Sequence, residues 1–169
     1  LPGPGHYLAL AVAGTPVLLT RDESGELHAL VNACAHRGAA VAEGSGPCRV
    51  LVCPFHGWAY HCDGRLRGRP GQEHFADNED GLDLTALPVS EKYGVIVVGA
   101  HAGVAQAEVD AALDEAGEEL AAIGLARYET IERRHFDVAA NWKLVNDLSL
   151  ESYHFANLHR DSVAQMLED

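Results

Sequence analysis

The sequence predicts a mainly β protein, in which an antiparallel β sandwich or barrel over residues 1–100 precedes a segment of helices and strands over residues 101–169. Two observations support this division. In the first hundred residues, short runs rich in Val, Leu and Tyr are separated by Gly, Pro and Asp turns, which is typical of antiparallel sheets. After residue 101, apolar residues recur at three- and four-residue spacing among Glu and Asp, which is typical of an amphipathic helix. We therefore expect a domain boundary near residue 101.

Turn signals define the expected strands of the first part. Asp63-Gly64 predicts a two-residue hairpin turn, because Gly adopts the positive φ of a type I′ turn without strain. Residues 70–86 contain few apolar side chains and predict a long loop. The expected strands are His6–Val12, Pro16–Arg21, Glu26–Asn32, Arg49–Val52, Trp58–Cys62 and Lys92–Gly99.

The second part is expected to contain two helices with a strand between them. Residues 127–138 alternate well enough to predict the strand, and Asn141–His159 predicts the second helix. The acidic residues of the first helix are interpreted as its solvated face. Its apolar positions are Val109, Leu113, Ala116, Leu120 and Ile123.

Composition excludes some classes of function. The net charge is −13, which argues against nucleic-acid binding, because the phosphate backbone requires clustered Lys and Arg. No apolar run approaches the ~18 residues of a membrane span. The first residues contain neither an initiating Met nor a signal-peptide pattern. We therefore expect a cytoplasmic protein, and one that is a piece of a longer chain.

Two short loops carry the most informative residues. Cys34-Ala35-His36 and Cys53-Pro54-Phe55-His56 each offer one thiolate and one imidazole, and each lies among small or kinked residues. Two thiolates on one iron and two imidazoles on the other is the ligand set of a Rieske [2Fe–2S] centre. A Cys₂His₂ zinc site is the main alternative, although zinc fingers usually pair like ligands rather than mixed ones. The sequence therefore predicts one-electron transfer.

The other two cysteines, Cys48 and Cys62, have no assigned role. A disulfide between them is conceivable, but spacing alone does not establish it, and an intracellular protein would normally keep both reduced.

A second set of candidate ligands lies in the last predicted helix. Asp147, Glu151 and His154 are spaced four and three residues apart and would share one helix face. His159 lies about 140° from His154 around an ideal helix, so both imidazoles reach one metal only if the helix ends or distorts between them. Asn157 is the expected place. Two His with a carboxylate suit non-haem iron, although exposed polar residues are the commoner explanation of such a group.

Basic residues gather near the two loops of an otherwise acidic chain. This arrangement favours a basic surface that attracts an acidic electron donor, with scattered solvated arginines as the alternative. The residues are Arg37, Arg49, Arg65, Arg67 and Arg69.

Together the motifs point to a family. The chain resembles the alpha (large) subunit of a Rieske non-haem iron aromatic ring-hydroxylating oxygenase over nearly its whole length. The resemblance rests on Cys34-Ala35-His36-Arg37-Gly38, Cys53-Pro54-Phe55-His56-Gly57-Trp58, Asn141-Trp142-Lys143-Leu144, Glu151-Ser152-Tyr153-His154 and Leu158-His159.

The resemblance implies a division of labour. Cys34, His36, Cys53 and His56 would hold the Rieske cluster. A flavin-dependent reductase, a ferredoxin or both would supply its electrons, and a mononuclear Fe(II) would receive them. With O₂ that iron would hydroxylate or dihydroxylate an organic, in this family usually aromatic, substrate.

The resemblance also assigns roles in the second part. His154 and His159 would be the histidine ligands of that iron. Glu151 would be the acidic residue that bridges a cluster histidine of one subunit to an iron histidine of its neighbour, in a homo-trimer. Many relatives carry Asp there, and relatives that act on quaternary amines can carry Glu.

Length sets this chain apart from the family. The family's third iron ligand is an Asp far downstream, in a helix-grip α+β catalytic domain, whereas this sequence stops ten residues after His159. We therefore expect a truncated catalytic domain that is not competent alone. An electron-transfer-only, Rieske ferredoxin-like protein is the alternative function.

Overall fold

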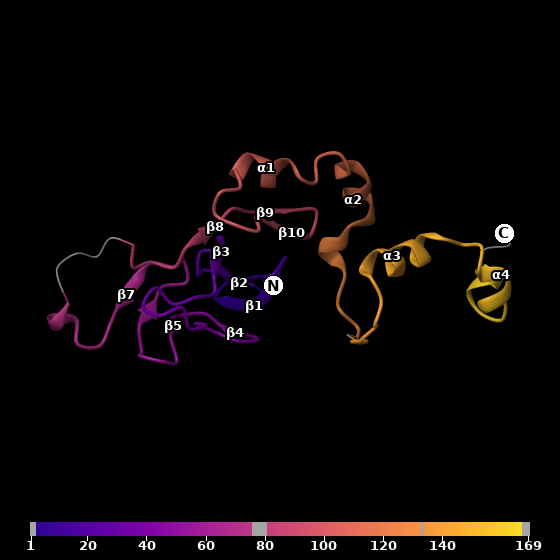
Figure 1. Cartoon of the computed structure of the whole chain (residues 1–169). Helices are drawn as coiled ribbons and strands as arrows, with labels where there is room; N and C mark the ends of the chain where they lie inside the picture. The colour runs from indigo at the N-terminus through magenta and orange to yellow at the C-terminus, as the bar shows by residue number, and fades with distance from the viewer. Residues whose placement is uncertain (1–2, 76–80, 133, 167–169) are drawn as a thin grey trace. The chain divides into compact units, whose positions relative to one another are not determined.

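The computed structural model describes residues 3–75, 81–132 and 134–166 of the 169-residue chain (Figure 1). The described chain divides into two units, Leu1–Tyr128 and Glu129–Asp169. Each unit is considered by itself below.

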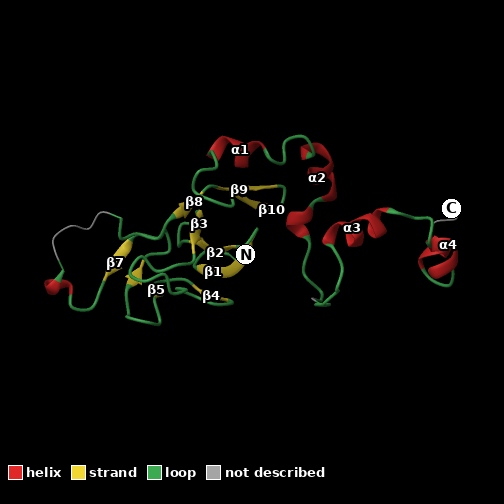
Figure 2. Cartoon of the chain, in the orientation of Figure 1, coloured by secondary structure: helices red, strands yellow, loops and turns green. Residues whose placement is uncertain are grey.

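The first unit is built from three antiparallel sheets (Figure 2). The largest has the strand order β4-β1-β2-β3-β8, the second β5-β6-β7 and the third β10-β9. Its strands are β1 His6–Val12, β2 Thr15–Arg21, β3 Leu27–Val31, β4 Ser45–Pro47, β5 Leu51–Val52, β6 Ala59–Tyr60, β7 Leu66–Gly68, β8 Ala86–Leu87, β9 Val89–Lys92 and β10 Val95–Val98.

The core lies on both faces of β2. Successive side chains of a strand point to opposite faces, so Val17 and Leu19 pack in one cluster while Leu18 packs in the other. The cluster around Leu18 also contains the side chains of Cys34 and Cys53, which come from the loops between strands. The two thiol groups are therefore part of the hydrophobic core.

One expected strand is confirmed only in part, over Val95–Val98. Lys92–Gly99 was expected to be continuous, but the chain turns at Tyr93 and Gly94, which both have positive φ, 56° and 81°. The segment is therefore a hairpin of β9 and β10. Its β-branched composition predicted extended structure but carried no strong signal for the turn.

The expected long helix after residue 101 is also wrong in detail. It forms two short helices, α1 Gln106–Ala111 and α2 Gly117–Ile123, followed by the 3₁₀ turn η2 Leu125–Arg127. Lys92 of β9 donates to the Asp110 carbonyl and to Asp114 Oδ1, the latter at 2.7 Å. The carboxylate of Asp114 raises the pKa of Lys92. This segment accordingly belongs to the first unit, and the domain boundary near residue 101 stays a prediction.

The long loop is interrupted by the 3₁₀ turn η1 Gln72–His74, and its residues 76–80 lie outside the described part of the chain. The other described residues of the loop up to Thr85 form no helix or strand, as expected, whereas Ala86 begins β8.

The described residues of the second unit form three helical segments: α3 Trp142–Leu150, α4 Phe155–Leu158 and the 3₁₀ turn η3 Val163–Met166. Asn141 caps α3, since its side chain accepts a hydrogen bond from the backbone N–H of Lys143 at 3.0 Å. The strand expected over 127–138 is wrong, because residues 128–132 and 134–138 form no strand. Among the described residues, no helix has the length and apolar character to cross a membrane.

Candidate functional site

The two cysteine–histidine loops close with the same pair of backbone hydrogen bonds. In the first loop, Cys34 N–H donates to Ala39 O and Gly38 N–H donates to Cys34 O, both at 2.8 Å. In the second, Cys53 N–H donates to Trp58 O at 2.8 Å and Gly57 N–H donates to Cys53 O at 3.0 Å. Gly38 and Gly57 both have φ of 73°, a conformation that a side chain would disfavour. The loops are thus matched turns, although their histidines sit at different offsets from the cysteine.

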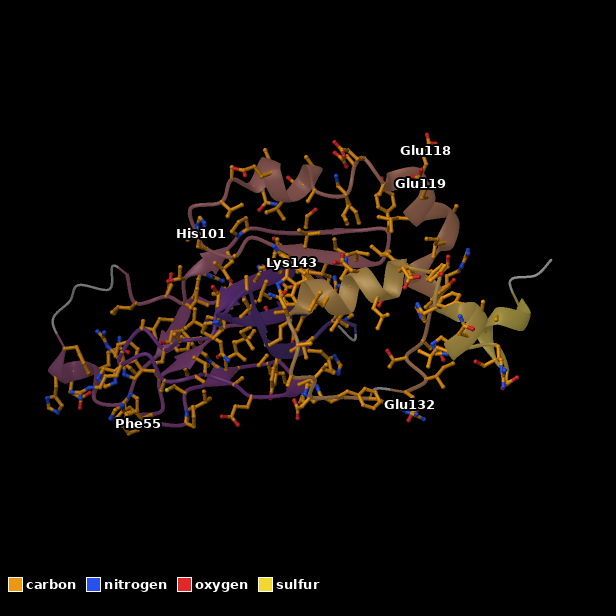
Figure 3. All side chains as sticks on the ribbon, turned by 45° about the vertical axis from the view of Figure 1, so that its right-hand side comes forward. Phe55, His101, Glu118, Glu119, Glu132 and Lys143 are labelled. Atoms are coloured by element: carbon orange, nitrogen blue, oxygen red, sulfur yellow. A yellow bond between two sulfur atoms is a disulfide. The ribbon has the colours of Figure 1, made fainter. Side chains whose placement is uncertain are left out.

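The four candidate ligands converge from these two loops. Cys34 and Cys53 are 3% and 2% exposed, and neither is in a disulfide. The rings of His36 and His56 meet edge to face with their centroids 4.5 Å apart. Phe55, beside them, is 66% exposed and lies at the surface of this part of the protein (Figure 3). The thiols therefore lie on the core side and the imidazoles nearer to solvent.

Tyr60 contacts the first thiol. Its hydroxyl lies 3.2 Å from Cys34 Sγ and accepts the backbone N–H of Ala35, also at 3.2 Å. Burial, followed by the hydrogen bond to Cys34, raises the pKa of Tyr60. The phenol therefore stays protonated and can donate its hydrogen to the sulfur.

His36 is the more enclosed of the two histidines. Its ring stacks on Trp58 with an interplanar angle of 3° and a centroid distance of 5.0 Å. Burial, and then the neighbouring His56 and Arg37, lower the pKa of His36. Its Nδ1 is buried and has no hydrogen-bond partner among the described residues. A neutral imidazole with a free buried nitrogen is suited to bind a metal.

These observations fit a [2Fe–2S] group. Two buried thiols and two adjacent imidazoles are its ligand types, and the unpartnered His36 Nδ1 gains a partner when a metal is bound. In the described part of the chain, the group that brings three ligand atoms within 4.8 Å of one another is Asp22, Glu26 and His28. The cysteine–histidine set is more widely spaced, as expected for ligands shared between two irons.

The Asp22 group is explained by turn structure. Asp22 Oδ1 accepts hydrogen bonds from Ser24 Oγ at 2.7 Å and from the backbone N–H of Glu26 at 2.9 Å. The hydrogen bond from Ser24 contributes most to lowering the pKa of Asp22 to about 2. The carboxylate therefore organises the turn between β2 and β3.

Cys48 and Cys62 form a disulfide, with their Cα atoms 6.1 Å apart. The sequence had left this pairing open. The covalent ring runs from residue 48 to residue 62 and thus contains Cys53 and His56. The disulfide therefore joins the two ends of the second loop and its flanking strands.

The arginines near the loops differ in exposure and in their contacts. Arg37, Arg49 and Arg67 are exposed, whereas Arg65 donates to Asp63 Oδ2 at 2.7 Å. The guanidinium of Arg69 contacts the rings of both Trp58 and Phe75. Fewer arginines are therefore free to attract a donor than the sequence suggested, and the basic surface stays a prediction.

In the second unit, His154 and His159 flank one short helix. His154 precedes α4 and His159 follows it, so the expected break does not fall at Asn157, which lies inside α4. The first break comes earlier, because α3 ends before Glu151. The two imidazole centroids are 5.3 Å apart. A short helix between two breaks thus brings together rings that a continuous helix would separate.

Glu151 holds the backbone and ring of His154. Its Oε1 accepts the backbone N–H of His154 at 3.1 Å, and its Oε2 lies 3.0 Å from His154 Nδ1. A carboxylate on Nδ1 leaves Nε2 free to bind a metal. Asp147 lies on α3, so the single helix face expected for it with Glu151 and His154 is wrong.

Two family models match this chain. The Rieske [2Fe–2S] domain matches residues 1–88, and the catalytic domain of ring-hydroxylating alpha subunits matches residues 125–168. The chain belongs to the family of Rieske oxygenase alpha subunits. The expected mainly β Rieske fold is confirmed, as is the expectation of a [2Fe–2S] cluster and a mononuclear iron as the cofactors of the family.

Similar proteins within this family differ in substrate. Over 97% of the chain it is 31% identical to the anthranilate 1,2-dioxygenase large subunit of Acinetobacter baylyi, and over 99% it is 30% identical to the glycine betaine monooxygenase oxygenase subunit of Chromohalobacter salexigens. The chain spans 36% and 38% of the lengths of these two relatives.

Solved Rieske oxygenases have the same fold. The quaternary ammonium monooxygenase CntA with L-carnitine matches 95% of the chain and 46% of its own, with a TM-score of 0.84 and 26% identity. Naphthalene 1,2-dioxygenase from a Rhodococcus species matches 95% of the chain and 38% of its own, with a TM-score of 0.76 and 25% identity.

Proposed function

We propose that this chain carries a Rieske cluster and two of the iron-binding histidines of an oxygenase component. In that component, electrons would reach a mononuclear iron for O₂-dependent hydroxylation of an organic substrate. The observation that supports this most is the convergence of two matched loops, which place two buried thiols and two contacting imidazoles together. The cluster, when bound, supplies one electron at a time.

Each side chain of the first site has a proposed role. Cys34 and Cys53 bind as thiolates, and His36 and His56 bind through a ring nitrogen. Tyr60 donates a hydrogen bond to the sulfur of Cys34, which stabilises added negative charge there. Trp58 covers His36 and keeps water from that side of the ring.

The second site is proposed to bind iron through His154 and His159. Glu151 orients His154 by accepting from its Nδ1, as carboxylates commonly do for metal-bound histidines. As a bridge to the cluster histidine of a neighbouring subunit, Glu151 would also connect the two metal sites. The intrachain contact supports the first of these roles.

Two substrate classes compete. The resemblance to anthranilate and naphthalene dioxygenases favours an aromatic substrate, which was the expectation from sequence. Glu151 and the resemblance to glycine betaine monooxygenase and CntA favour a quaternary ammonium compound. In the full-length protein, substrate-dependent O₂ uptake with benzoate-type acids against betaine and choline would distinguish them.

We propose a ferredoxin, a flavin-dependent reductase or both as the electron donor, and a homo-trimer as the assembly. A cytoplasmic location also stays a prediction. Disulfides are rare in that compartment, so the buried Cys48–Cys62 bond is a feature that any assignment of location has to explain.

Metal analysis tests the proposal. We expect two irons and two acid-labile sulfides per chain, with a Rieske EPR signal after reduction. His56→Cys should shift the absorption and EPR spectra toward those of a plant-type ferredoxin, since the ligand becomes a thiolate. The matched control is His61→Cys, an exposed histidine near the same loop, which should leave both spectra unchanged. Unchanged spectra in His56→Cys would show that His56 is not a ligand.

An electron carrier is the second candidate, because the first unit alone contains the cluster site and its core. The variant Glu151→Gln in the full-length protein separates the two functions. An oxygenase component should retain both metals but lose electron delivery to the iron in a single turnover. Normal electron delivery to the iron in this variant would show that Glu151 is not part of the electron-transfer route. A full-length protein that binds no third iron would favour the electron carrier.

A further inference from the structure

We propose that Arg69 is a positioning residue for the cluster: it holds Trp58 flat against His36, and its charge favours the reduced state. This inference rests on the proposed function, because it requires the cluster that the two loops would hold. Arg69 is not a candidate ligand, and the basic-surface hypothesis had placed it among residues that face an external partner.

The geometry is a cluster of four groups around Trp58. The His36 ring lies parallel to the Trp58 indole, 5.0 Å from it. The Cζ of Arg69 lies 5.6 Å from the Trp58 ring centroid and 4.3 Å from that of Phe75. Phe75 meets Trp58 edge to face at 6.0 Å. A guanidinium within about 6 Å of an aromatic ring is attracted to its face, so Arg69 stabilises the orientation of Trp58.

The ring of Pro70, beside Arg69, packs on the second loop. Pro70 Cγ lies 3.4 Å from the place where a Cβ on Gly57 would stand, and Gly57 has a positive φ that disfavours one. Residues 69–70 therefore approach the loop at Gly57 and Trp58. Trp58 is 4% exposed as a result of contacts on several sides.

Arg69 has a buried polar atom without a hydrogen-bond partner among the described residues. Its Nε is buried and has no hydrogen-bond partner among the described residues, whereas the neighbouring Arg65 has the Asp63 carboxylate. A buried donor without a hydrogen-bond partner lowers the stability of the folded state, so the buried Nε gives no stability reason for an Arg at this position. A role for its charge near the cluster gives a physical reason for the residue.

The charge has a definite direction of effect. Reduction adds one negative charge to the cluster, and a nearby cation stabilises that charge. A unit charge about 10 Å away at an effective dielectric constant near 20 changes such an equilibrium roughly tenfold. Partial exposure of Arg69 reduces this, so we expect a several-fold effect.

Two substitutions separate charge from stacking, and both are made in the 169-residue chain with its cluster. Arg69→Met keeps an apolar stem beside the two rings and removes the charge. Arg69→Lys keeps the charge and removes the planar group. The matched control is Arg67→Gln, which removes an exposed positive charge from the adjacent strand. All are compared by midpoint potential and by near-UV circular dichroism of Trp58, in a Trp142→Phe background because Trp142 is 71% exposed and would also contribute.

Arg69→Met should lower the ratio of reduced to oxidised cluster several-fold at a fixed ambient potential, where tenfold corresponds to 59 mV for one electron. Arg69→Lys should retain most of the potential but alter the Trp58 signal. Arg67→Gln should change the ratio less than about twofold at 0.15 M salt, because an exposed charge is screened.

The possible outcomes separate a failure of the Arg69 inference from a failure of the proposed function on which it rests. Parent protein without iron and sulfide would refute the proposed function itself. Parent protein with a cluster, together with an Arg69→Met protein of equal iron content and unchanged potential, would overturn the inference alone. If Arg69→Met loses the cluster, Arg69→Lys becomes the test. An unchanged near-UV signal of Trp58 in Arg69→Lys would then refute the positioning role.

Discussion

The two units of the chain hold their candidate ligands in different ways. In the first unit, side-chain hydrogen bonds join distant parts of the sequence, such as Thr15 to Ala100 at 2.8 Å and Arg21 to Glu91 at 2.9 Å. In the described part of the second unit, the side-chain hydrogen bonds join residues no more than four positions apart.

Burial follows the same division. Leu18 and Leu30 of the first unit are 0% and 1% exposed, whereas Trp142 and Leu150 of the second are 71% and 79% exposed. The comparison shows that the cysteine–histidine site is held by its own core. In the described part of the second unit, the contacts of the Glu151–His154–His159 group are with near neighbours in the sequence.

The largest expected effect is complete loss of the cluster on substitution of a ligand in the first unit. Substitution of a candidate iron ligand in the second unit should leave the cluster in place. Cys53→Ser should abolish the cluster, because serine does not replace the thiolate ligand, while His154→Ala should leave its iron and sulfide content at the parent level. Visible absorption and metal analysis measure both. Cluster loss in His154→Ala would show that the units depend on each other for this site.

Core substitutions test the difference in packing. Leu18→Ala should reduce the free energy of unfolding by about 2–5 kcal/mol, because it opens a cavity in a filled core. Leu148→Ala, at a position 54% exposed, should change it by less than about 0.5 kcal/mol. Urea unfolding of each variant gives the values, and similar losses at both sites would contradict the comparison.

The disulfide is a covalent constraint within the first unit. Closing a loop of this length stabilises a fold by about 3 kcal/mol, so the double variant Cys48→Ala, Cys62→Ala should lose about that amount. Peptide mapping without reductant should find residues 48 and 62 linked. Complete alkylation of both cysteines in unreduced, denatured protein would disprove the bond.

A smaller effect is expected at the turn of Asp22. Because the folded pKa of Asp22 is lowered to about 2 from 3.8, its contribution is present above pH 4 and is lost as the pH falls toward 2. Asp22→Asn should cost about 1 kcal/mol at pH 7, allowing for solvent screening, and close to nothing once the pH is below the folded pKa of about 2.

The matched control for Asp22 is Glu132→Gln in the second unit, whose carboxylate pairs with Arg134 at the surface at 2.7 Å. It should change stability by less than about 0.5 kcal/mol at either pH. Denaturant titrations at pH 7 and about pH 1.5 would test both, and a pH-independent effect of Asp22→Asn would exclude the charge as its cause.

Local signals in the sequence were sufficient for much of the fold. The limits of β1 were predicted as the structure has them, since its turns carry clear Gly and Pro signals. The hairpin at Tyr93-Gly94 was missed because the β-branched run Val95–Val98 dominates residues 92–99, and β9 before the turn has only one β-branched residue, Val89. The helix break before Glu151 was missed because residues 141–159 have helical periodicity throughout, and what interrupts it is not visible in that pattern.

The sequence by itself determined the ligand types and their grouping into two loops, because cysteine and histidine chemistry and Gly/Pro turns are local properties. It also contained, unrecognised, the two-residue spacing by which Trp58, just before β6, and Tyr60, within β6, enter the same buried cluster. Only the tertiary structure decided that Tyr60 meets Cys34, that Cys48 joins Cys62 and that Arg69 lies over Trp58. These contacts join separate strands and loops, and their existence depends on how the sheets fold over the core.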